Sequence, residues 1–399
     1  MSKSMQDAYI VAAVRTPVGK KGGMFRHVRP DDMLAHVLKA VVGQVPELDL
    51  TEIGDVIVGC AMPEAEQGMN VARIGLLLAG FPSSVPGITI NRFCSSGLQA
   101  VADAAARIRL GEADVMIAAG TESMSVMPQI MGNKVSINPA VFAKEENYAI
   151  AFGMGLTAEK VAQKWGVSRE DQDAFALASH QKALAAIDQG LFRDEIAPYP
   201  VYTHLPGSNG TPRVVEHQAD TDEGPRRDTS LETLARLRPV FAARGTVTAG
   251  NSSQMSDGAG AVLLMSEAAL KRYQVTPIAR VAAYAVAGVP PEIMGIGPVA
   301  AIPKALARVG IRQENLDWIE LNEAFAAQSL AVMRELDLDP ARVNPLGGAI
   351  ALGHPLGATG AIRTATVISA MKRDPNLKYG MVTMCIGTGM GAAGIFERV

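Results

Sequence analysis

The chain has 399 residues, which at roughly 150 residues per domain allows two to three domains. Its 37 basic and 40 acidic residues give a formal net charge of −3, which argues against a nucleic-acid or anionic-membrane surface spread over the whole protein. Apolar residues make up 48% of the chain and only three residues are cysteines, so wholesale disorder and a disulfide framework are excluded. We expect free thiols, and because no CxxC or HExxH pattern occurs we expect no metal site.

Strand-like and helix-like segments alternate along the first third of the chain. Buried-type strands are predicted over residues 9–15, 55–60, 85–90 and 114–119. Helices are predicted over residues 31–45, 70–80 and 98–109. This alternation predicts an α/β fold with parallel strands and with helices on both faces of the sheet.

The segment in the middle of the chain, residues 122–249, is richer in proline, glycine, methionine and polar residues. It contains one clear amphipathic helix, residues 169–191, and irregular strands and turns are expected over residues 199–215. Its second half carries a group of arginines: Arg213, Arg226, Arg227, Arg236, Arg238 and Arg244. This basic end is either an ordinary solvated rim or a binding surface, and composition alone does not decide between them.

The last third repeats the order of the first. Three pairs of segments correspond: residues 316–321 with 53–58, 342–344 with 89–91, and 379–384 with 114–119. We therefore interpret the chain as two duplicated α/β halves with an insertion, although chance similarity between generic strand–helix–strand units remains an alternative. The predicted units are residues 1–121 with 250–272, the insertion 122–249, and residues 273–399.

Neither end carries a recognisable targeting signal. The first nine residues lack the apolar core of a secretory signal, and the C-terminal FERV is neither a peroxisomal tripeptide nor a prenylation motif. The most apolar long stretch, residues 281–289, is far shorter than the roughly 20 residues that a membrane helix needs. We expect a cytoplasmic protein without membrane insertion.

Cys94 lies in the turn NRFCSSG, between a predicted strand and a predicted helix. A helix N-terminus offers unpaired N–H groups and the positive end of the macrodipole, so a lowered thiol pKa and a nucleophile near neutral pH are expected. The alternative is a small buried core cysteine, and this feature alone leaves both interpretations open.

The C-terminal copy contributes an imidazole and a second thiol. His354 stands in the turn GGAIALGHP, which corresponds to the turn of Cys94, so pseudo-twofold packing of the halves would bring the two side chains together. Cys385 ends a predicted strand and is followed by IGTGMG, whose glycines let backbone N–H groups approach an oxyanion. Asn322 adds an amide donor at the end of another strand. Together these groups suit acyl transfer through a thioester, whereas Cys60, inside a buried-type strand, is interpreted as core.

These motifs together resemble the thiolase family, the acyl-CoA C-acyltransferases, over essentially the whole chain. Four motifs carry the resemblance: Cys94-Ser95-Ser96, Asn322-Glu323-Ala324-Phe325, Gly353-His354-Pro355 and Cys385-Ile386-Gly387. Each is weak alone, but their order and spacing are specific. The resemblance implies duplicated halves in layers α-β-α-β-α with an inserted loop domain.

The resemblance also implies a mechanism. Cys94 attacks the keto carbon of a 3-ketoacyl-CoA and forms an acyl-enzyme. His354 activates Cys94 and, with a water held by Asn322, stabilises the thioester oxygen. Cys385 protonates the departing acetyl-CoA enolate and then deprotonates the incoming CoA thiol. The backbone N–H groups of Cys94 and Gly387 form a second oxyanion hole, and CoA is a co-substrate, with no permanently bound cofactor.

Contacts to CoA follow from the resemblance by position. They are Arg226 at the adenine or phosphate end, Thr233 near the adenine, Ser253 and Phe241 along the pantetheine, and Met154 and Phe325 near the acyl end. The arginines of the insertion then have a ligand, because CoA carries phosphates.

Two features favour a degradative thiolase of the fatty-acid β-oxidation type. The segments NRFCSSGLQ and NSSQ look like those of degradative 3-ketoacyl-CoA thiolases, and Gly153 precedes Met154 where many acetoacetyl-CoA-forming relatives carry histidine. A small residue leaves room for a longer acyl chain. Three methionines either line such a pocket or pack in the core: Met124, Met127 and Met131.

Other functions remain as alternatives. The rival within the family is a biosynthetic acetyl-CoA acetyltransferase that condenses two acetyl-CoA into acetoacetyl-CoA, and a remote one is a non-catalytic acyl-CoA-binding protein. The second thiol, Cys385, disfavours a ketosynthase, and the duplicated fold disfavours a thiol peroxidase. The family implies a homodimer or homotetramer and a further β-oxidation enzyme as a candidate partner. Chain length, direction and oligomer size stay open.

Overall fold

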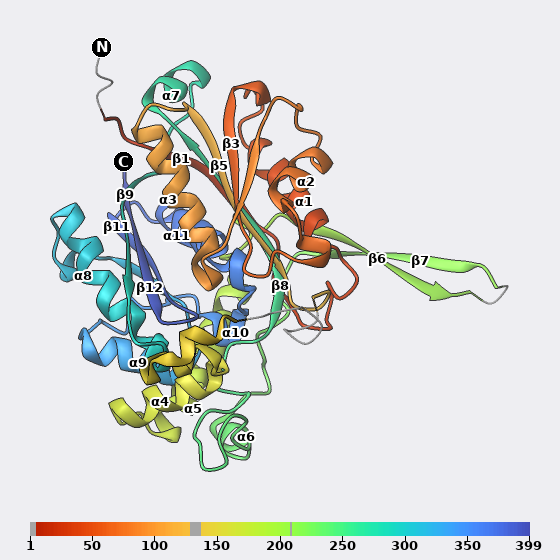
Figure 1. Ribbon diagram of the computed structural model, residues 1–399. Helices are drawn as coiled ribbons and strands as arrows, with labels where there is room; N and C mark the ends of the chain where they lie inside the picture. The colour runs from red at the N-terminus through yellow and green to blue at the C-terminus, as the bar shows by residue number, and fades with distance from the viewer. Residues whose placement is uncertain (1–4, 128–136, 208–209) are drawn as a thin grey trace.

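The computed structural model describes residues 5–127, 137–207 and 210–399 (Figure 1). Its strands are β1 (Tyr9–Arg15), β2 (Gly19–Lys20), β3 (Ile53–Gly59), β4 (Gly87–Ile90), β5 (Val115–Ser123), β6 (Tyr199–Pro206), β7 (Pro212–Ala219), β8 (Ser256–Met265), β9 (Ala279–Gly288), β10 (Trp318–Leu321), β11 (Tyr379–Ile386) and β12 (Met390–Arg398). The main sheet has the order β10-β11-β12-β9-β1-β8-β5-β3-β4, with β2 added at β8.

The helices follow the capping signals of the sequence. They are α1 (Pro30–Val42), α2 (Val71–Leu78), α3 (Ser96–Arg109), α4 (Met154–Trp165), α5 (Arg169–Asp188), α6 (Leu231–Ala235), α7 (Glu267–Tyr273), α8 (Gly297–Val309), α9 (Ala326–Glu335), α10 (Ala349–Leu352) and α11 (Thr359–Arg373). The side chain of Asn70 accepts from the N–H of Arg73 and begins α2, and Ser168 begins α5 in the same way. None of the described helices is long and apolar enough to cross a lipid bilayer.

The strand order confirms the predicted duplication. The N-terminal half reads β1-β8-β5-β3-β4 and the C-terminal half reads β9-β12-β11-β10. In the N-terminal half the fifth strand, β4, pairs with β3. At the corresponding place in the C-terminal half, Val343 forms a parallel bridge to Ile319 of β10, so the fifth strand position is repeated as well. The halves join where β1 pairs with β9, through Tyr9 with Arg280 and Ile10 with Ala279.

The prediction of parallel pairing throughout the sheet is wrong. Among the paired strands of the described residues, β3–β4, β3–β5 and β10–β11 are parallel, whereas β8 and β12 run antiparallel to their neighbours. The reason is that neither of these strands follows a crossover helix. Strand β8 returns from the long insertion, and β12 follows β11 through a tight turn in which Thr388 and Gly389 have positive φ. Sequence reasoning also missed β8, whose ten residues are all buried.

Helices and sheet halves alternate in the predicted layers α-β-α-β-α. Helices α1 and α2 cover the outer face of the N-terminal half, α3 and α11 lie between the halves, and α8 with α9 covers the outer face of the C-terminal half (Figure 1). The central helices approach so closely that side chains are excluded at their first turns. A Cβ atom on Gly97 would lie 2.7 Å from the backbone nitrogen of Ala361, and one on Gly360 would collide with Leu98. The N-termini of α3 and α11 therefore meet.

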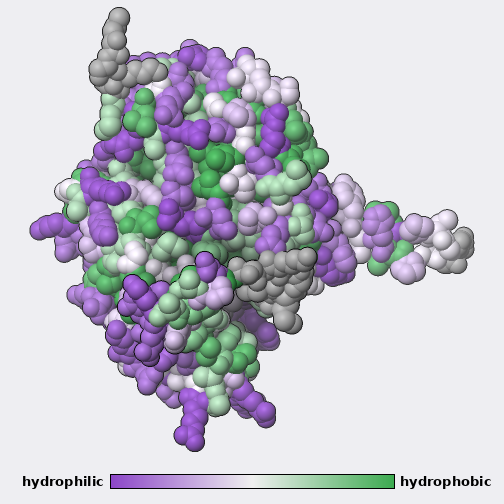
Figure 2. Space-filling model, viewed as in Figure 1, coloured by the Kyte–Doolittle hydropathy of each residue, from purple (hydrophilic) through white to green (hydrophobic). Residues whose placement is uncertain are grey.

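The insertion is attached to the sheet by a buried ion pair. The Arg15 guanidinium, at the end of β1, lies 2.6 Å from Glu195 and 2.7 Å from Asp222, and all three side chains are buried. Instead of irregular strands, β6 and β7 form a regular antiparallel hairpin that projects from the body (Figures 1 and 2). Met124 and Met127 are buried, whereas Met131 lies outside the described residues.

Candidate active site

The turn that carries Cys94 is braced by its own polar groups. It is a short helical turn, Phe93–Ser95, that leads from β4 into α3. Phe93 has a φ of 45°, in the left-handed region that non-glycine residues rarely adopt. Its N–H donates to the side chain of Asn91 at 2.8 Å, and its carbonyl accepts from the Ser96 hydroxyl at 2.7 Å. These bonds hold Cys94 at the start of α3, where the sequence predicted it.

The predicted low pKa of the Cys94 thiol is wrong. Burial raises its pKa to about 11, and the nearby N–H groups of Gly387 and of Cys94 itself lower it only in part. Desolvation of a thiolate therefore outweighs the helix N-terminus at this position. At neutral pH Cys94 is a thiol, and it needs a base at hand to become a nucleophile.

His354 supplies an uncharged imidazole. It follows α10 at Gly353, whose φ of 91° turns the chain and whose Cβ position is occupied by Ser256 Oγ. The imidazole is buried, with Nε2 3.3 Å from Asn322 Nδ2 and Nδ1 2.7 Å from Thr359 Oγ1. Burial, and next the charge of Arg363, lower the pKa of His354 to about 3. The ring is therefore neutral and can accept a proton.

The turns of Cys94 and His354 lie against each other. The helical turn Leu356–Ala358, just after His354, packs on the turn Phe93–Ser95. A buried carboxylate fastens the contact: Glu122 accepts from the N–H of Gly357 at 2.9 Å and from the N–H of Ala61 at 2.7 Å. The pseudo-twofold relation of the halves thus brings the thiol-bearing turn and the imidazole-bearing turn to one place.

The second thiol and the backbone glycine complete this centre. The N–H of Asn322, at the end of β10, donates to the carbonyl of Thr383 on β11 at 2.9 Å, so Asn322 lies beside the strand that carries Cys385. Burial and the neighbouring Cys94 raise the pKa of Cys385. The backbone N–H of Gly387, two residues after Cys385, is close enough to the Cys94 thiol to lower its pKa, so the two cysteines lie near each other. Cys60, also buried, contacts Glu122 instead.

Apolar side chains surround the exit from this centre. A Cβ atom on Gly387 would lie 3.7 Å from the ring of Phe93 and 3.8 Å from the sulfur of Met154, and both side chains are exposed on their other side. The ring of Phe241 stands edge-on to that of Phe325, with centroids 6.0 Å apart. Phe325 packs in one buried cluster with Cys385. These aromatic and thioether groups can hold an acyl chain or a pantetheine arm.

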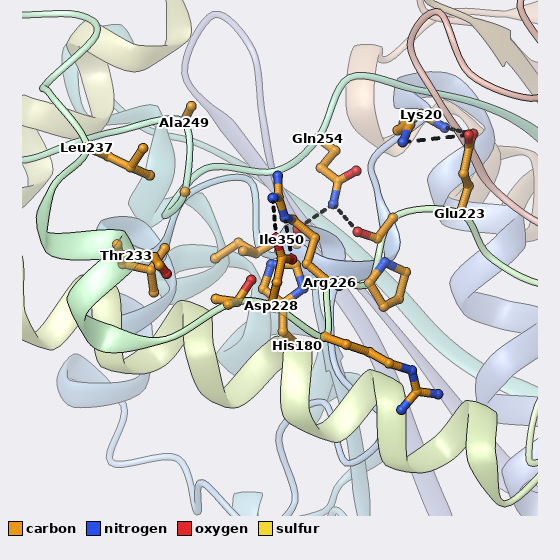
Figure 3. Close-up of a pocket in the computed structure, with 16 residues that line it drawn as sticks. Lys20, His180, Glu223, Arg226, Asp228, Thr233, Leu237, Ala249, Gln254 and Ile350 are labelled. Atoms are coloured by element: carbon orange, nitrogen blue, oxygen red, sulfur yellow. Dashed lines mark hydrogen bonds and ion pairs between the residues drawn. The ribbon is translucent and has the colours of Figure 1, made fainter.

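A polar cavity of about 710 Å³ opens next to the centre (Figure 3). Of the six contacts expected from the resemblance, Arg226 and Thr233 line it, whereas Ser253, Met154, Phe241 and Phe325 do not. Ser253 is nonetheless tied to the centre, since its N–H donates to the carbonyl of Ala324 at 2.9 Å. Gln254 connects the two regions, because it lines the cavity and its carbonyl accepts from the N–H of His354 at 3.2 Å.

The cations of this cavity are paired with carboxylates. Arg226 lies 2.9 Å from Asp228, and Lys20 lies 3.8 Å from Glu223. Arg227 pairs with Asp188. These pairs are exposed and weak, so a phosphate can replace the carboxylates.

Among the lining residues to which sequence reasoning gave no role are Lys20, His180 and Gln254. The imidazole of His180 accepts from the N–H of Arg226 at 3.2 Å, and burial, followed by Arg226, lowers its pKa to about 4. His180 lies on the buried face of α5, which consists of polar and small residues rather than the apolar stripe predicted, so no local pattern marks it. Gln254 belongs to the segment NSSQ, which the sequence analysis used as a mark of degradative thiolases without giving Gln254 a role in binding.

Comparisons with known proteins agree with this architecture. Residues 8–268 match the family model "Thiolase, N-terminal domain", and residues 275–398 match "Thiolase, C-terminal domain". The 3-ketoacyl-CoA thiolase of Bacillus subtilis (strain 168) is 51% identical over 394 residues, covering 98% of this chain and 100% of the relative. The crystal structure of the Bacillus anthracis acetyl-CoA acetyltransferase has a TM-score of 0.89 at 40% identity and covers 100% of both chains. Human mitochondrial 3-ketoacyl-CoA thiolase has a TM-score of 0.87 at 38% identity, covering 99% of both. The chain belongs to the thiolase family of acyltransferases.

Proposed function

We propose that this protein is a degradative thiolase that cleaves 3-ketoacyl-CoA with CoA into acetyl-CoA and a shortened acyl-CoA, as in fatty-acid β-oxidation. One observation carries the proposal: two neighbouring thiols, the half-buried Cys94 and the buried Cys385, lie beside the turn that holds a neutral imidazole. The 51% identity to a relative named 3-ketoacyl-CoA thiolase supports the degradative direction.

The first half-reaction breaks a carbon–carbon bond. His354 Nε2 takes the proton of Cys94 as the sulfur attacks the keto carbon, and the N–H groups of Cys94 and Gly387 stabilise the oxyanion. The bond to the α-carbon then breaks, and its electron pair forms the enolate of acetyl-CoA. Protonated His354 and Asn322 stabilise the enolate oxygen. Cys385 donates its proton to the α-carbon, which releases acetyl-CoA and leaves an acyl group on Cys94.

The second half-reaction transfers the acyl group to CoA. The Cys385 thiolate takes the proton of the incoming CoA thiol, and the CoA sulfur attacks the thioester carbonyl of the acyl-enzyme. Cys94 leaves and recovers its proton from His354, so both thiols and the imidazole return to their starting states. The raised thiol pKa values suit this cycle, because each thiol carries its proton until a partner removes it.

The polar cavity is the proposed CoA site. Arg226 and its neighbours would exchange their carboxylate partners for the phosphates of CoA, and Thr233 would lie near the adenine. The pantetheine would pass Ser253 and Phe241 toward Cys94. At the inner end, the acyl group would contact Met154 and Phe325.

A second candidate function is condensation of two acetyl-CoA into acetoacetyl-CoA. The similarity to the Bacillus anthracis acetyl-CoA acetyltransferase favours it. Against it stands Gly153, since many acetoacetyl-CoA-forming relatives carry a histidine at this position.

A substrate series separates these functions. We expect CoA-dependent cleavage with kcat/KM that rises from acetoacetyl-CoA to medium and long 3-ketoacyl-CoA. The Cys94→Ala variant should show no acyl adduct by intact-protein mass spectrometry after mixing with substrate. Cleavage of acetoacetyl-CoA alone would overturn the chain-length assignment, and an adduct on the Cys94→Ala variant would overturn the nucleophile.

The remaining assignments concern organisation. We propose a homodimer or homotetramer in the cytoplasm, built from the units 1–121 with 250–272, 122–249 and 273–399. A further β-oxidation enzyme is a candidate partner. Size-exclusion chromatography with light scattering tests the oligomer, since a mass of one chain would contradict it.

A further inference from the structure

The two ring nitrogens of His354 have different partners, and both partners are buried. On one side Nε2 lies 3.3 Å from Asn322 Nδ2, and on the other Nδ1 lies 2.7 Å from the hydroxyl of Thr359. Thr359 is 1% exposed and Asn322 is 1% exposed, so water does not compete with either contact. A neutral imidazole carries one proton, and these two contacts decide which nitrogen holds it.

The amide side favours a proton on Nδ1. An amide nitrogen can only donate, so Nε2 accepts from Asn322 and carries no proton in this arrangement. The Asn322 Oδ1 atom has no hydrogen-bond partner among the described residues. The proposed function makes the same demand, because only an unprotonated Nε2 can take the proton of Cys94. The proton of His354 therefore belongs on Nδ1, where it faces Thr359.

The hydroxyl of Thr359 is placed to accept a hydrogen bond from that Nδ1–H group. It is the first residue of α11, five positions after His354, and the helical turn Leu356–Ala358 bends the chain so that hydroxyl and ring meet. Its contact with His354 is the one side-chain hydrogen bond of the Thr359 hydroxyl within the described parts of the chain. One turn further along α11, buried Arg363 lies 3.6 Å from Glu320, and its charge disfavours an imidazolium nearby. In the resting protein the imidazole of His354 is therefore neutral and adopts one of two tautomers.

We propose that Thr359 is a positioning residue for the thiolase reaction: its hydroxyl accepts the Nδ1–H of His354 and so leaves Nε2 unprotonated, the state in which it can take the proton of Cys94. The inference rests on the proposed function of Cys94 and His354. It goes beyond that function, because it assigns the tautomer and the side chain that selects it. In the opposite tautomer Nε2 already carries a proton, and the ring cannot act as a base toward the thiol.

Two substitutions at Thr359 distinguish the effect of losing its hydroxyl group from the effect of losing its packing. Thr359→Val keeps the shape and removes the oxygen, whereas Thr359→Ser keeps the oxygen and removes a methyl group. We expect kcat of Thr359→Val to fall about 10- to 100-fold with KM nearly unchanged, by analogy with the loss of partners that orient a histidine. Thr359→Ser should keep most of the activity. Equal losses in both variants, or full activity in Thr359→Val, would overturn the proposal.

The tautomer of His354 can also be measured by NMR, without any catalytic turnover. In the NMR spectrum of isotope-labelled histidine, His354 should show a protonated Nδ1 and a bare Nε2, assigned by the signals that vanish in His354→Gln. Thr359→Val should shift this pattern toward protonated Nε2, and Thr359→Ser should not. An unchanged pattern in Thr359→Val contradicts the proposal. Alkylation of Cys94 by iodoacetamide should slow in Thr359→Val alone.

The failure of the proposed function would look different. If wild-type protein cleaves no 3-ketoacyl-CoA, the function assigned above is wrong, yet the NMR experiment still decides whether Thr359 selects the tautomer. Thermal unfolding of both variants shows whether they fold. A loss of activity that follows a loss of folded protein in Thr359→Val, with the wild-type tautomer retained, would count against a positioning role.

Discussion

The centre around Cys94 keeps its ionisable side chains neutral, whereas the polar cavity around Arg226 holds charged side chains. In the centre, burial keeps the thiol of Cys94 protonated and the imidazole of His354 neutral. In the cavity, the charges of Arg226 and Lys20 stay near solvent and are balanced by carboxylates. Under the proposed function, proton transfer and anion binding take place in separate regions. Substitutions in the centre should lower kcat, and those in the cavity should raise KM.

The largest effect is expected from removing the second thiol. Cys385→Ala should lower kcat about 1,000-fold, because protonation of the enolate and deprotonation of CoA both lose their acid or base. KM should change little. Steady-state thiolysis assays measure both constants. The matched control is Cys60→Ala, a buried thiol outside the centre, which should turn over at about the wild-type rate; equal losses in the two variants would contradict the assignment.

An intermediate effect is expected on stability at acid pH. Because the pKa of His354 is lowered from 6.5 to about 3, only the unfolded chain binds this proton between those values, and stability falls as pH falls below 6.5. The slope from one such group approaches about 1.4 kcal/mol per pH unit. The raised pKa of Glu320, about 7, acts with the opposite sign. The test therefore compares the pH dependence of stability in the wild type with that in a variant that lacks His354.

That test compares wild type with His354→Asn by urea unfolding at pH 7 and pH 5. The free energy of unfolding of His354→Asn should fall less between these pH values, by about 2 kcal/mol, because the variant lacks the buried base. His27→Asn, at an exposed histidine, is the control and should behave as wild type. The same pH dependence in His354→Asn and wild type would show that folding does not lower the pKa of this imidazole.

The smallest effect is expected in the cavity. Arg226→Ala should raise KM for CoA about tenfold with kcat unchanged, as expected for one charge-assisted contact of about 1.4 kcal/mol. The effect should shrink at high salt and with dephospho-CoA. Arg312→Ala, at an arginine that is 84% exposed and lies outside the cavity, controls for net charge. A fall in kcat for Arg226→Ala would mean that the two regions are not separate.

Local features were predictable from the sequence. The turns of Cys94 and His354 are encoded by neighbouring glycine and serine residues, and the repeated strand order follows from repeated apolar segments. Features that depend on distant segments were not. The pKa of Cys94 is set by how deeply the folded halves bury it, which no turn motif reveals. Lys20 and His180 reach the cavity from separate elements, and the antiparallel β8 depends on where the insertion returns.

The buried group of Arg15, Glu195 and Asp222 constrains how this protein can change over time. Losing Arg15 leaves two buried carboxylates without their cation, a defect of about 3–5 kcal/mol that few proteins tolerate. Neutral replacement of Arg15 therefore requires that its two carboxylate partners be replaced as well. Since Arg15 belongs to the sheet while its partners belong to the insertion, the insertion cannot be exchanged for that of a distant homologue unless the ion pair is transplanted with it.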